Sequence, residues 1–204
     1  MRATLAAATF LGAFLLFQVQ PIWSKQILPW FGGGPAVWTA CMLFFQTMLF
    51  AGYAWAHGTE RHLRGTARFV AHVGLLLAGC VFIPMLPGDG GWRPSESATP
   101  TLSILRTLLV NVGAPFLVLS TTGPIVQSWF SRLYPGESPY RLYALSNLGS
   151  LAALLTYPFV VEPNLRLHPQ GYVWSAGFAI FVMACGAWAV TIYRAAKNGP
   201  AAAA

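Results

Sequence analysis

The chain has 204 residues, of which 56% are hydrophobic and only 8% are charged. Because an average soluble domain carries roughly 25% charged residues, this composition excludes an ordinary water-soluble domain. The formal charge of +7 comes from basic residues scattered between apolar blocks. Without a clustered basic face, that charge favours no nucleic-acid partner. The first partner that the composition indicates is the lipid bilayer.

The apolar residues fall in blocks of about twenty, the length that a helix needs to cross roughly 30 Å of hydrocarbon. The sequence therefore predicts an all-α integral membrane protein with about six transmembrane helices, and two three-helix repeats are one arrangement open to it. The predicted spans are residues 3–20, 35–57, 69–87, 102–130, 139–161 and 172–193. They make up a polytopic membrane domain over residues 1–194, and residues 195–204 are predicted to be a cytoplasmic tail.

The first predicted span follows Arg2, and no small-residue cleavage site comes after it, so we expect a retained helix rather than a signal peptide. The predicted loop over residues 18–38 carries Lys25 in an apolar stretch, beside amides and three glycines. Lys25 either presents a cation to an anionic ligand at the mouth of a cavity or is a snorkelling lysine near a flexible turn. No GKS or GKT follows the glycines, so they do not form a phosphate-binding loop.

The fourth predicted span is too long for a straight crossing, because about 29 residues rise roughly 43 Å at 1.5 Å per residue. Pro115 and the pair Gly123-Pro124 weaken its backbone hydrogen bonding, so we expect it to tilt, bend or break. Hydroxyl and amide side chains lie beside the second of these sites, among them those of Thr121, Thr122 and Gln127. They either line a hydrated path or satisfy carbonyls that Pro124 frees.

The fifth predicted span opens with Ser138 as a helix cap and Pro139 in the first turn. Tyr140, Tyr143 and Asn147 then fall at i, i+3 and i+7, which puts them on one helix face. This polar face is expected to contact protein or water rather than lipid. Helix packing through interhelical hydrogen bonds accounts for it, and a substrate path is the alternative.

Ionisable residues inside membrane spans are candidates for function. Arg106 and Glu162 lie near the same outer depth and are a candidate ion pair, whereas His72 is expected to be an anchor near the inner interface. The sequence has no Ser/His/Asp set, no carboxylate pair and no metal-ligand spacing, and its three cysteines lie singly in apolar blocks. We therefore expect no enzymatic activity, no metal and no cofactor.

The short loops divide the basic residues into two groups. The larger group consists of Arg2, Arg61, Arg64, Arg68, Arg132, Arg141, Arg194 and Lys197, and the smaller one of Lys25, Arg93 and Arg166. Because Lys and Arg are retained on the cytoplasmic side, we expect both termini in the cytoplasm. The membrane that we expect is a bacterial inner membrane. Tryptophans are expected at the interfaces, with Trp23, Trp30, Trp38, Trp92 and Trp174 outside and Trp55 and Trp129 inside.

Four segments carry a family resemblance. They are FLLFQVQPIWSKQILPWFGGGPAVWTACMLFFQ (14–46), AGYAWAH (51–57), LSTTGPIVQSWF (119–130) and SPYRLYALSNLGSLAALLTYPFVVEP (138–163). Together they resemble the membrane portion of bacterial spermidine-synthase-like proteins, in which a major-facilitator-like membrane domain is fused to an aminopropyltransferase-like domain. The chain departs from that family because these residues include neither a glycine-rich nucleotide turn nor acidic catalytic residues. The resemblance thus implies a transporter-like membrane domain without aminopropyl transfer.

Two functions remain open at this point. A transporter-like domain of unknown substrate would have Lys25, Thr121, Thr122, Gln127, Tyr143 and Asn147 facing one cavity. Six spans make one half of a twelve-helix transporter, so a second copy or another membrane subunit would complete the pathway. The alternative is a non-catalytic structural or accessory subunit that packs against a larger membrane protein complex.

Overall fold

A computed structural model describes residues 2–85, 99–134 and 136–198. The helices are α1 (Arg2–Phe31), α2 (Pro35–His62), α3 (Gly65–Cys80), α4 (Pro100–Leu133), α5 (Tyr140–Thr156), the π-helix η1 (Tyr157–Val161), α6 (Glu162–Asn164) and α7 (Leu167–Asn198). In the described ranges, five segments are long and apolar enough to cross a membrane, with α5, η1 and α6 counted as one, and α3 is a shorter apolar helix. The prediction of an all-α membrane protein with about six transmembrane helices is confirmed.

The first helix is longer than the sequence predicts, because α1 continues through Pro21 and Pro29. Proline removes one backbone hydrogen bond, but inside a membrane protein the neighbouring helices can satisfy the freed groups, so the helix need not end. α1 stops before Gly32, whose φ of +84° suits only a residue without a side chain. The predicted loop over residues 18–38 is therefore wrong, and only residues 32–34 separate α1 from α2.

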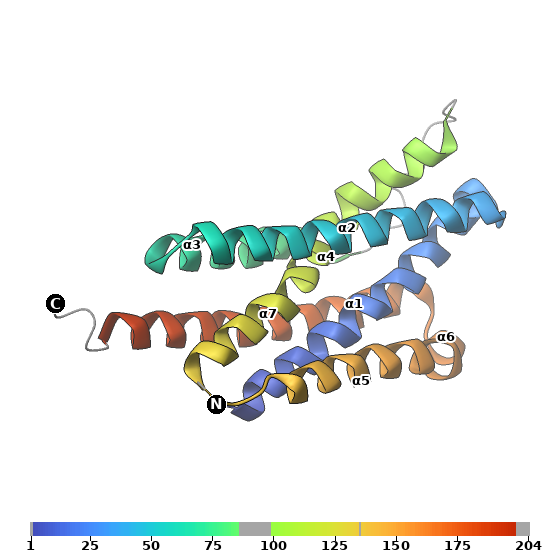
Figure 1. The fold of residues 1–204 in the computed structure, drawn as a ribbon. Helices are drawn as coiled ribbons and strands as arrows, with labels where there is room; N and C mark the ends of the chain where they lie inside the picture. The colour runs from blue at the N-terminus through green and yellow to red at the C-terminus, as the bar shows by residue number, and fades with distance from the viewer. Residues whose placement is uncertain (1, 86–98, 135, 199–204) are drawn as a thin grey trace.

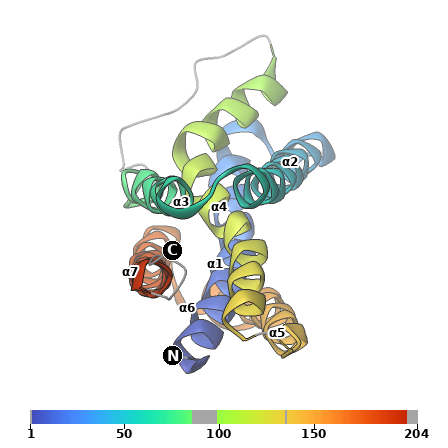
Figure 2. The ribbon, with the colours of Figure 1, turned by 60° about the vertical axis from the view of Figure 1, so that its left-hand side comes forward.

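The fourth helix bends but does not break. α4 runs as one helix of 34 residues, with Pro115 and Pro124 inside it. Its ribbon changes direction part-way along its length in both views (Figures 1 and 2). Of the three expected outcomes for this long span, the structure thus has the bend, and helical hydrogen bonding continues past Gly123-Pro124.

Two three-helix units pack around one another. α1 and α4 lie in the middle, α2 and α5 lie on one side, and α3 and α7 lie on the other (Figure 2). Between the units, α1 contacts α4, α5 and α7, while α4 contacts α1, α2 and α3, and α3 contacts α7. Exchanging α1 with α4, α2 with α5 and α3 with α7 leaves this set of contacts unchanged. Because α1 and α4 also run in opposite directions (Figure 1), the units are arranged as an inverted repeat.

Glycines allow the closest approaches between the two units. A Cβ atom on Gly149 of α5 would lie 2.5 Å from the carbonyl oxygen of Phe10 in α1. A Cβ atom on Gly52 of α2 would overlap the Ser120 side chain of α4. These α1–α5 and α4–α2 contacts are equivalent under the helix exchange, so each unit uses a glycine at the same crossing.

Both the beginning of α1 and the end of α7 lie at one end of the bundle, which we call the N-terminal end (Figure 1). The α2–α3 connection and the start of α5 lie there too, so this end collects the described basic residues Arg61, Arg64, Arg68, Arg141 and Arg194. Lys25 and Arg166 lie at the opposite end, and Arg93 is outside the described residues. α7 extends into the predicted tail as far as Asn198, and residues 199–204 are outside the described part.

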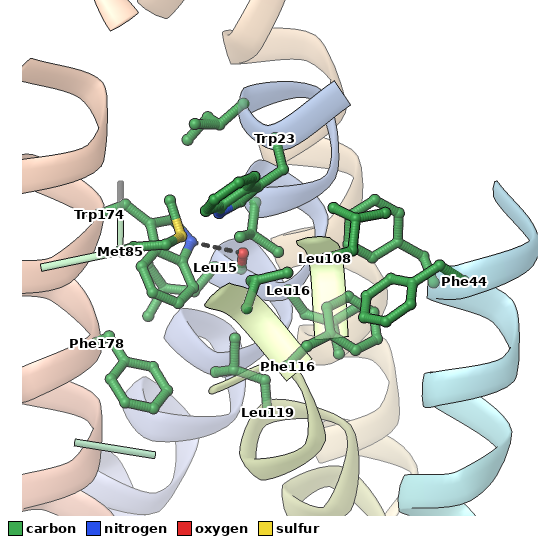
Figure 3. Packing of buried hydrophobic residues seen from close by; sticks show 14 of the residues in the cluster. Leu15, Leu16, Trp23, Phe44, Met85, Leu108, Phe116, Leu119, Trp174 and Phe178 are labelled. Carbon is green, nitrogen blue, oxygen red and sulfur yellow. Dashed lines mark hydrogen bonds between the residues drawn. The ribbon is translucent and has the colours of Figure 1, made fainter. Parts of the chain in front are cut away.

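The largest hydrophobic core lies between the middle of the bundle and the opposite end. Trp23, Phe116 and Phe178 are fully buried there (Figure 3). The indole N–H of Trp174 donates to the Leu15 carbonyl at 2.9 Å, which joins α7 to α1 (Figure 3). Trp23 and Trp174 therefore belong to the core and not, as the sequence suggested, to the lipid interface.

Other tryptophans that were expected at the interfaces are divided between the interior and the surface of the bundle. Trp129 is buried, whereas Trp38 and Trp55 are exposed on the surface of the described bundle. Trp92 lies outside the described residues. An indole near the end of a span can thus point into the bundle or out of it. The position of a residue along the span does not determine which face of the helix carries its side chain.

Candidate functional site

A cavity of about 430 Å³ lies between α1, α2, α4 and α5. Its lining falls within residues 9–17 of α1, 49–53 of α2, 119–127 of α4 and 143–150 of α5. Each of these stretches extends from near the middle of its span toward the N-terminal end. The cavity therefore occupies the half of the bundle nearer that end, between the central helices α1 and α4 and the outer helices α2 and α5.

The lining combines polar and apolar side chains. Its hydroxyl and amide side chains are those of Thr9, Tyr53, Ser120, Thr122, Gln127, Tyr143, Ser146, Asn147 and Ser150. Leu16, Phe17, Leu49 and Leu119 supply much of its apolar surface. No charged side chain is among the described residues that line it.

Four of the six residues expected to share a cavity lie at this one: Thr122, Gln127, Tyr143 and Asn147. Thr121 is fully buried, and its hydroxyl donates to the Val118 carbonyl at 2.8 Å. Adjacent helical residues point about 100° apart because a turn holds 3.6 residues, so Thr122 faces the cavity and Thr121 does not. The expectation is therefore wrong for Thr121, and it is wrong for Lys25 as well.

Lys25 lies at the opposite end of the bundle, where its ammonium group pairs with the Glu162 carboxylate. Because α1 continues beyond the predicted end of the first span, Lys25 lies beside the end of the fifth span. Lys25 and Glu162 are 137 positions apart in the chain. Glu162 thus pairs with Lys25 and not with the expected Arg106. Both members of the Lys25–Glu162 pair line a separate polar pocket with Arg166 and Gln170.

Several cavity hydroxyls donate to backbone carbonyls of their own helix. Ser120 Oγ donates to Leu117 at 2.9 Å, and Thr122 Oγ1 donates to Val118 at 2.9 Å. The carbonyl that Pro124 frees belongs to Ser120, so these bonds do not satisfy it as expected. Back-bonding of this kind bends helices, which fits the bend of α4. Each engaged hydroxyl oxygen still has lone pairs that can accept a hydrogen bond.

Other cavity side chains have open hydrogen-bonding capacity. Within the described ranges, no hydrogen-bond partner is found for the side chains of Tyr53, Gln127, Tyr143, Ser146 and Asn147. Two amides, two phenols and a hydroxyl therefore remain able to bind a solute or water. These side chains are the part of the site that can form hydrogen bonds to a ligand.

The sequence interpretation missed part of the lining. Ser146 and Ser150 follow Tyr143 at i+3 and i+7, and Asn147 follows it at i+4, which is the pattern of one helix face. That pattern was a usable signal for both serines. Thr9 and Tyr53 lie singly in apolar blocks, so nothing in the sequence distinguished them from packing residues.

Buried and half-buried polar contacts join the helices around the cavity at both of its ends. Gln18 of α1 donates from Nε2 to the Ala153 carbonyl and to Thr156 Oγ1 of α5, each at 3.1 Å. Toward the N-terminal end, Ser128 Oγ of α4 donates to a Glu60 carboxylate oxygen of α2 at 2.7 Å. These bonds tie α1 to α5 and α4 to α2, which are the two pairs that frame the cavity.

The second end contact extends to the start of α3. Arg68 lies 3.4 Å from the Glu60 carboxylate and donates to the Glu60 and Leu63 carbonyls at the end of α2. His72, one turn further along α3, is buried against the Trp129 ring with 4.9 Å between ring centroids. His72 is thus an interior residue and not the expected interface anchor. Its Nδ1 atom has no partner among the described residues.

The fold and this site define the class of the protein: an all-α polytopic membrane protein with a cavity between two three-helix units, whose described lining carries hydroxyl and amide groups and no charged side chain. Compared with known proteins, the chain matches no family model, no curated protein and no solved structure. In the described part of the chain, no group of three His, Cys, Asp or Glu side chains is placed to hold a metal ion.

Proposed function

We propose that the chain is a transporter-like membrane domain and forms one half of a solute pathway. The observation that carries this proposal is the polar cavity between the two inverted units, with an exposed rim where Tyr53 is 51% and Tyr143 is 58% accessible. Inverted repeats are common in secondary transporters, whose substrate sites lie near the bilayer midplane at the repeat interface. The position of the cavity supports this comparison, because the lining begins near the middle of the four spans.

A second protein surface is needed to complete such a pathway. The fifth span is only 17% buried along its most apolar window, compared with 50% for the first and fourth spans. Polar groups facing lipid tails are costly, so the amides and phenols on this side require water or protein beside them. We assign that role to a second copy or to another membrane subunit, in line with the resemblance to one half of a major-facilitator-like domain.

The orientation follows from the basic residues. The N-terminal end carries Arg61, Arg64, Arg141 and Arg194. By the positive-inside rule, the proposed orientation has this end on the cytoplasmic side of a bacterial inner membrane. In this orientation the cavity lies in the cytoplasmic half of the bundle. The proposed domain then has its cavity in the cytoplasmic half and its largest apolar core in the outer half.

The exposed fifth span also favours a second candidate function, that of an accessory subunit without transport. In this case a larger membrane protein packs on α2 and α5 and fills the cavity with its own side chains. The two functions differ in one property: a transport cavity is wet, whereas a filled interface is dry.

The distinguishing experiment is cysteine labelling in membrane vesicles of both orientations. Asn147→Cys is introduced after Cys41, Cys80 and Cys185 have been replaced by alanine, and a membrane-impermeant maleimide is added. We expect fast labelling from the cytoplasmic side and slower labelling from the outer side, because a transporter exposes its site alternately. Leu151→Cys, which lies on the same helix and outside the cavity lining, is the control and should not react.

Labelling of Asn147→Cys from neither side would contradict transport and support the accessory role. Labelling from the cytoplasmic side alone would also contradict transport, since the site would then never open outward. Fixed-stoichiometry purification with a different membrane protein, together with absent labelling, would establish the second candidate function.

A further inference from the structure

The cavity has no charge to offer a charged ligand. Its described lining contains hydroxyl, phenol, amide and apolar side chains only. At the two ends of the bundle, Glu60 pairs with Arg68 and Lys25 pairs with Glu162. Moving an ion into a protein interior without an opposite charge is strongly unfavourable. The cavity therefore disfavours a polyamine, a dicarboxylate or any other solute with a net charge.

Hydrogen-bonding groups face the cavity from several of its helices. The Gln127 amide comes from α4 and the Asn147 amide from α5, and each provides a carbonyl acceptor and an NH₂ donor. The Tyr53 and Tyr143 hydroxyls can donate or accept. The Thr122 hydroxyl, whose proton is engaged at Val118, can only accept. A ligand satisfies this set only if it carries both donors and acceptors, as hydroxyl and carboxamide groups do.

The remaining lining suits the carbon skeleton of such a ligand. Phe17, Tyr53 and Tyr143 contribute aromatic rings, against which C–H groups can pack. The volume of about 430 Å³ lies in the lower part of the range for small-molecule sites, roughly 300–1,000 Å³. The site is thus sized for a compact solute rather than for a lipid or a peptide.

We infer that the cavity binds a neutral small molecule with several hydroxyl or carboxamide groups, and that Gln127 and Asn147 make its principal polar contacts. This inference rests on the proposed function, because a transported solute occupies the same cavity. It adds the chemical class of the substrate, which the transporter assignment leaves open.

The test is a binding panel on the purified full chain in lipid nanodiscs, with thermal unfolding as the readout. The neutral probes are myo-inositol, D-glucose and nicotinamide, and the charged probes are spermidine and succinate. We expect at least one neutral probe to raise the Tm saturably and neither charged probe to do so. Asn147→Ala should weaken the binding of that neutral probe about tenfold, since the probe loses its hydrogen bonds to the amide.

A second variant adds a charge to the cavity. Asn147→Asp keeps the shape of the side chain and introduces a carboxylate, so it should abolish neutral-probe binding or weaken it at least tenfold and create spermidine binding. Asn164→Asp is the control, because Asn164 lies at the opposite end, outside the cavity, where its amide donates to the Val160 carbonyl at 2.7 Å. This control should bind the panel as the unmodified protein does.

Failure of all three neutral probes overturns the inference, and so does binding of spermidine or succinate that Asn147→Ala abolishes. The two proposals fail separately. Neutral-probe binding with labelling of Asn147→Cys from one side only retains the ligand class and overturns transport. Labelling from both sides with binding of a charged probe retains transport and overturns the ligand class.

Discussion

The two halves of the bundle share their helices but are packed differently. Toward the opposite end, buried residues of α1, α2, α4 and α7 form one continuous cluster that includes Trp23, Phe116 and Phe178 (Figure 3). Toward the N-terminal end, the described apolar core divides into two small clusters, and the polar cavity lies between α1, α2, α4 and α5. We call these the sealed half and the hollow half. Their difference teaches that the same helices pack tightly toward one end of the bundle and leave a cavity toward the other.

Side-chain size determines how one set of helices produces both halves. Lipid tails are as apolar as a core side chain, so helices in a membrane associate through close packing and hydrogen bonds. In the sealed half, large rings fill the space that α1, α4 and α7 leave. In the hollow half, small residues of the same central helices line the cavity, such as Gly12, Ser120 and Gly123. Shape, rather than hydrophobicity alone, therefore decides where the cavity forms.

The largest effect on stability is expected from the sealed half. Phe116→Ala should lower the free energy of unfolding by about 3–5 kcal/mol, because it leaves a void among fully buried side chains. Leu109→Ala is the control on the same helix, where the side chain is 55% exposed, and it should cost far less. Denaturant unfolding in detergent measures both. A Phe116→Ala variant as stable as Leu109→Ala would remove the basis for a sealed half.

The next effect concerns the crossing that holds one wall of the hollow half. Gly149→Ala should destabilise the protein by about 1–3 kcal/mol, because the added methyl group meets the Phe10 backbone, which cannot move aside as a side chain can. Gly186→Ala adds the same methyl group where no atom lies within 4 Å and should be tolerated. Equal stability of the two variants would show that the α1–α5 contact is not close.

A smaller effect is expected at the boundary between the halves. Gln18→Leu removes two hydrogen bonds from α1 to α5 and should cost about 1 kcal/mol, the usual value for an interhelical polar contact in a membrane. Gln20→Leu is the matched control, because Gln20 donates only to the Leu16 carbonyl of its own helix. The difference between the Tm values of the two variants measures how much the α1–α5 hydrogen bonds stabilise the protein. Equal Tm values would mean that these hydrogen bonds do not hold α1 against α5.

The smallest effect on stability is expected inside the cavity. Asn147→Ala should change the free energy of unfolding by no more than about 0.5 kcal/mol, because its amide has no partner among the described residues. The same variant should nevertheless lose ligand binding. If it instead destabilised the protein as much as Phe116→Ala, the cavity residues would be part of the packing and the contrast between the halves would disappear.

The sequence predicted the spans well because their signal is long: about twenty apolar residues in a row seldom occur outside a membrane. It failed where a local rule competed with the tertiary environment. Pro21 favoured an early end for the first helix, but α1 continues past it, and this continuation is what brings Lys25 to Glu162. That pairing depends on how far α1 extends, which no local pattern contains.

The candidate site was predictable to the extent that helix periodicity reveals it. Tyr143 and Asn147 share a face at a spacing of four residues, and both line the cavity. Thr121 and Thr122 are neighbours of the same type, and only the packing of α4 decides which of them faces the cavity. The sequence around Tyr53 has no pattern that predicts a cavity residue. Tyr53 lines the cavity because of the position of α2 relative to α5.

Hydrogen–deuterium exchange of the unmodified protein in lipid nanodiscs tests the contrast between the halves most directly. Residues 104–116 of α4 belong to the sealed half, and residues 119–130 of the same helix border the hollow half. If water enters the cavity, peptides from 119–130 should exchange markedly faster than those from 104–116. Equal protection of the two segments, or faster exchange in residues 104–116, would contradict a water-filled hollow half.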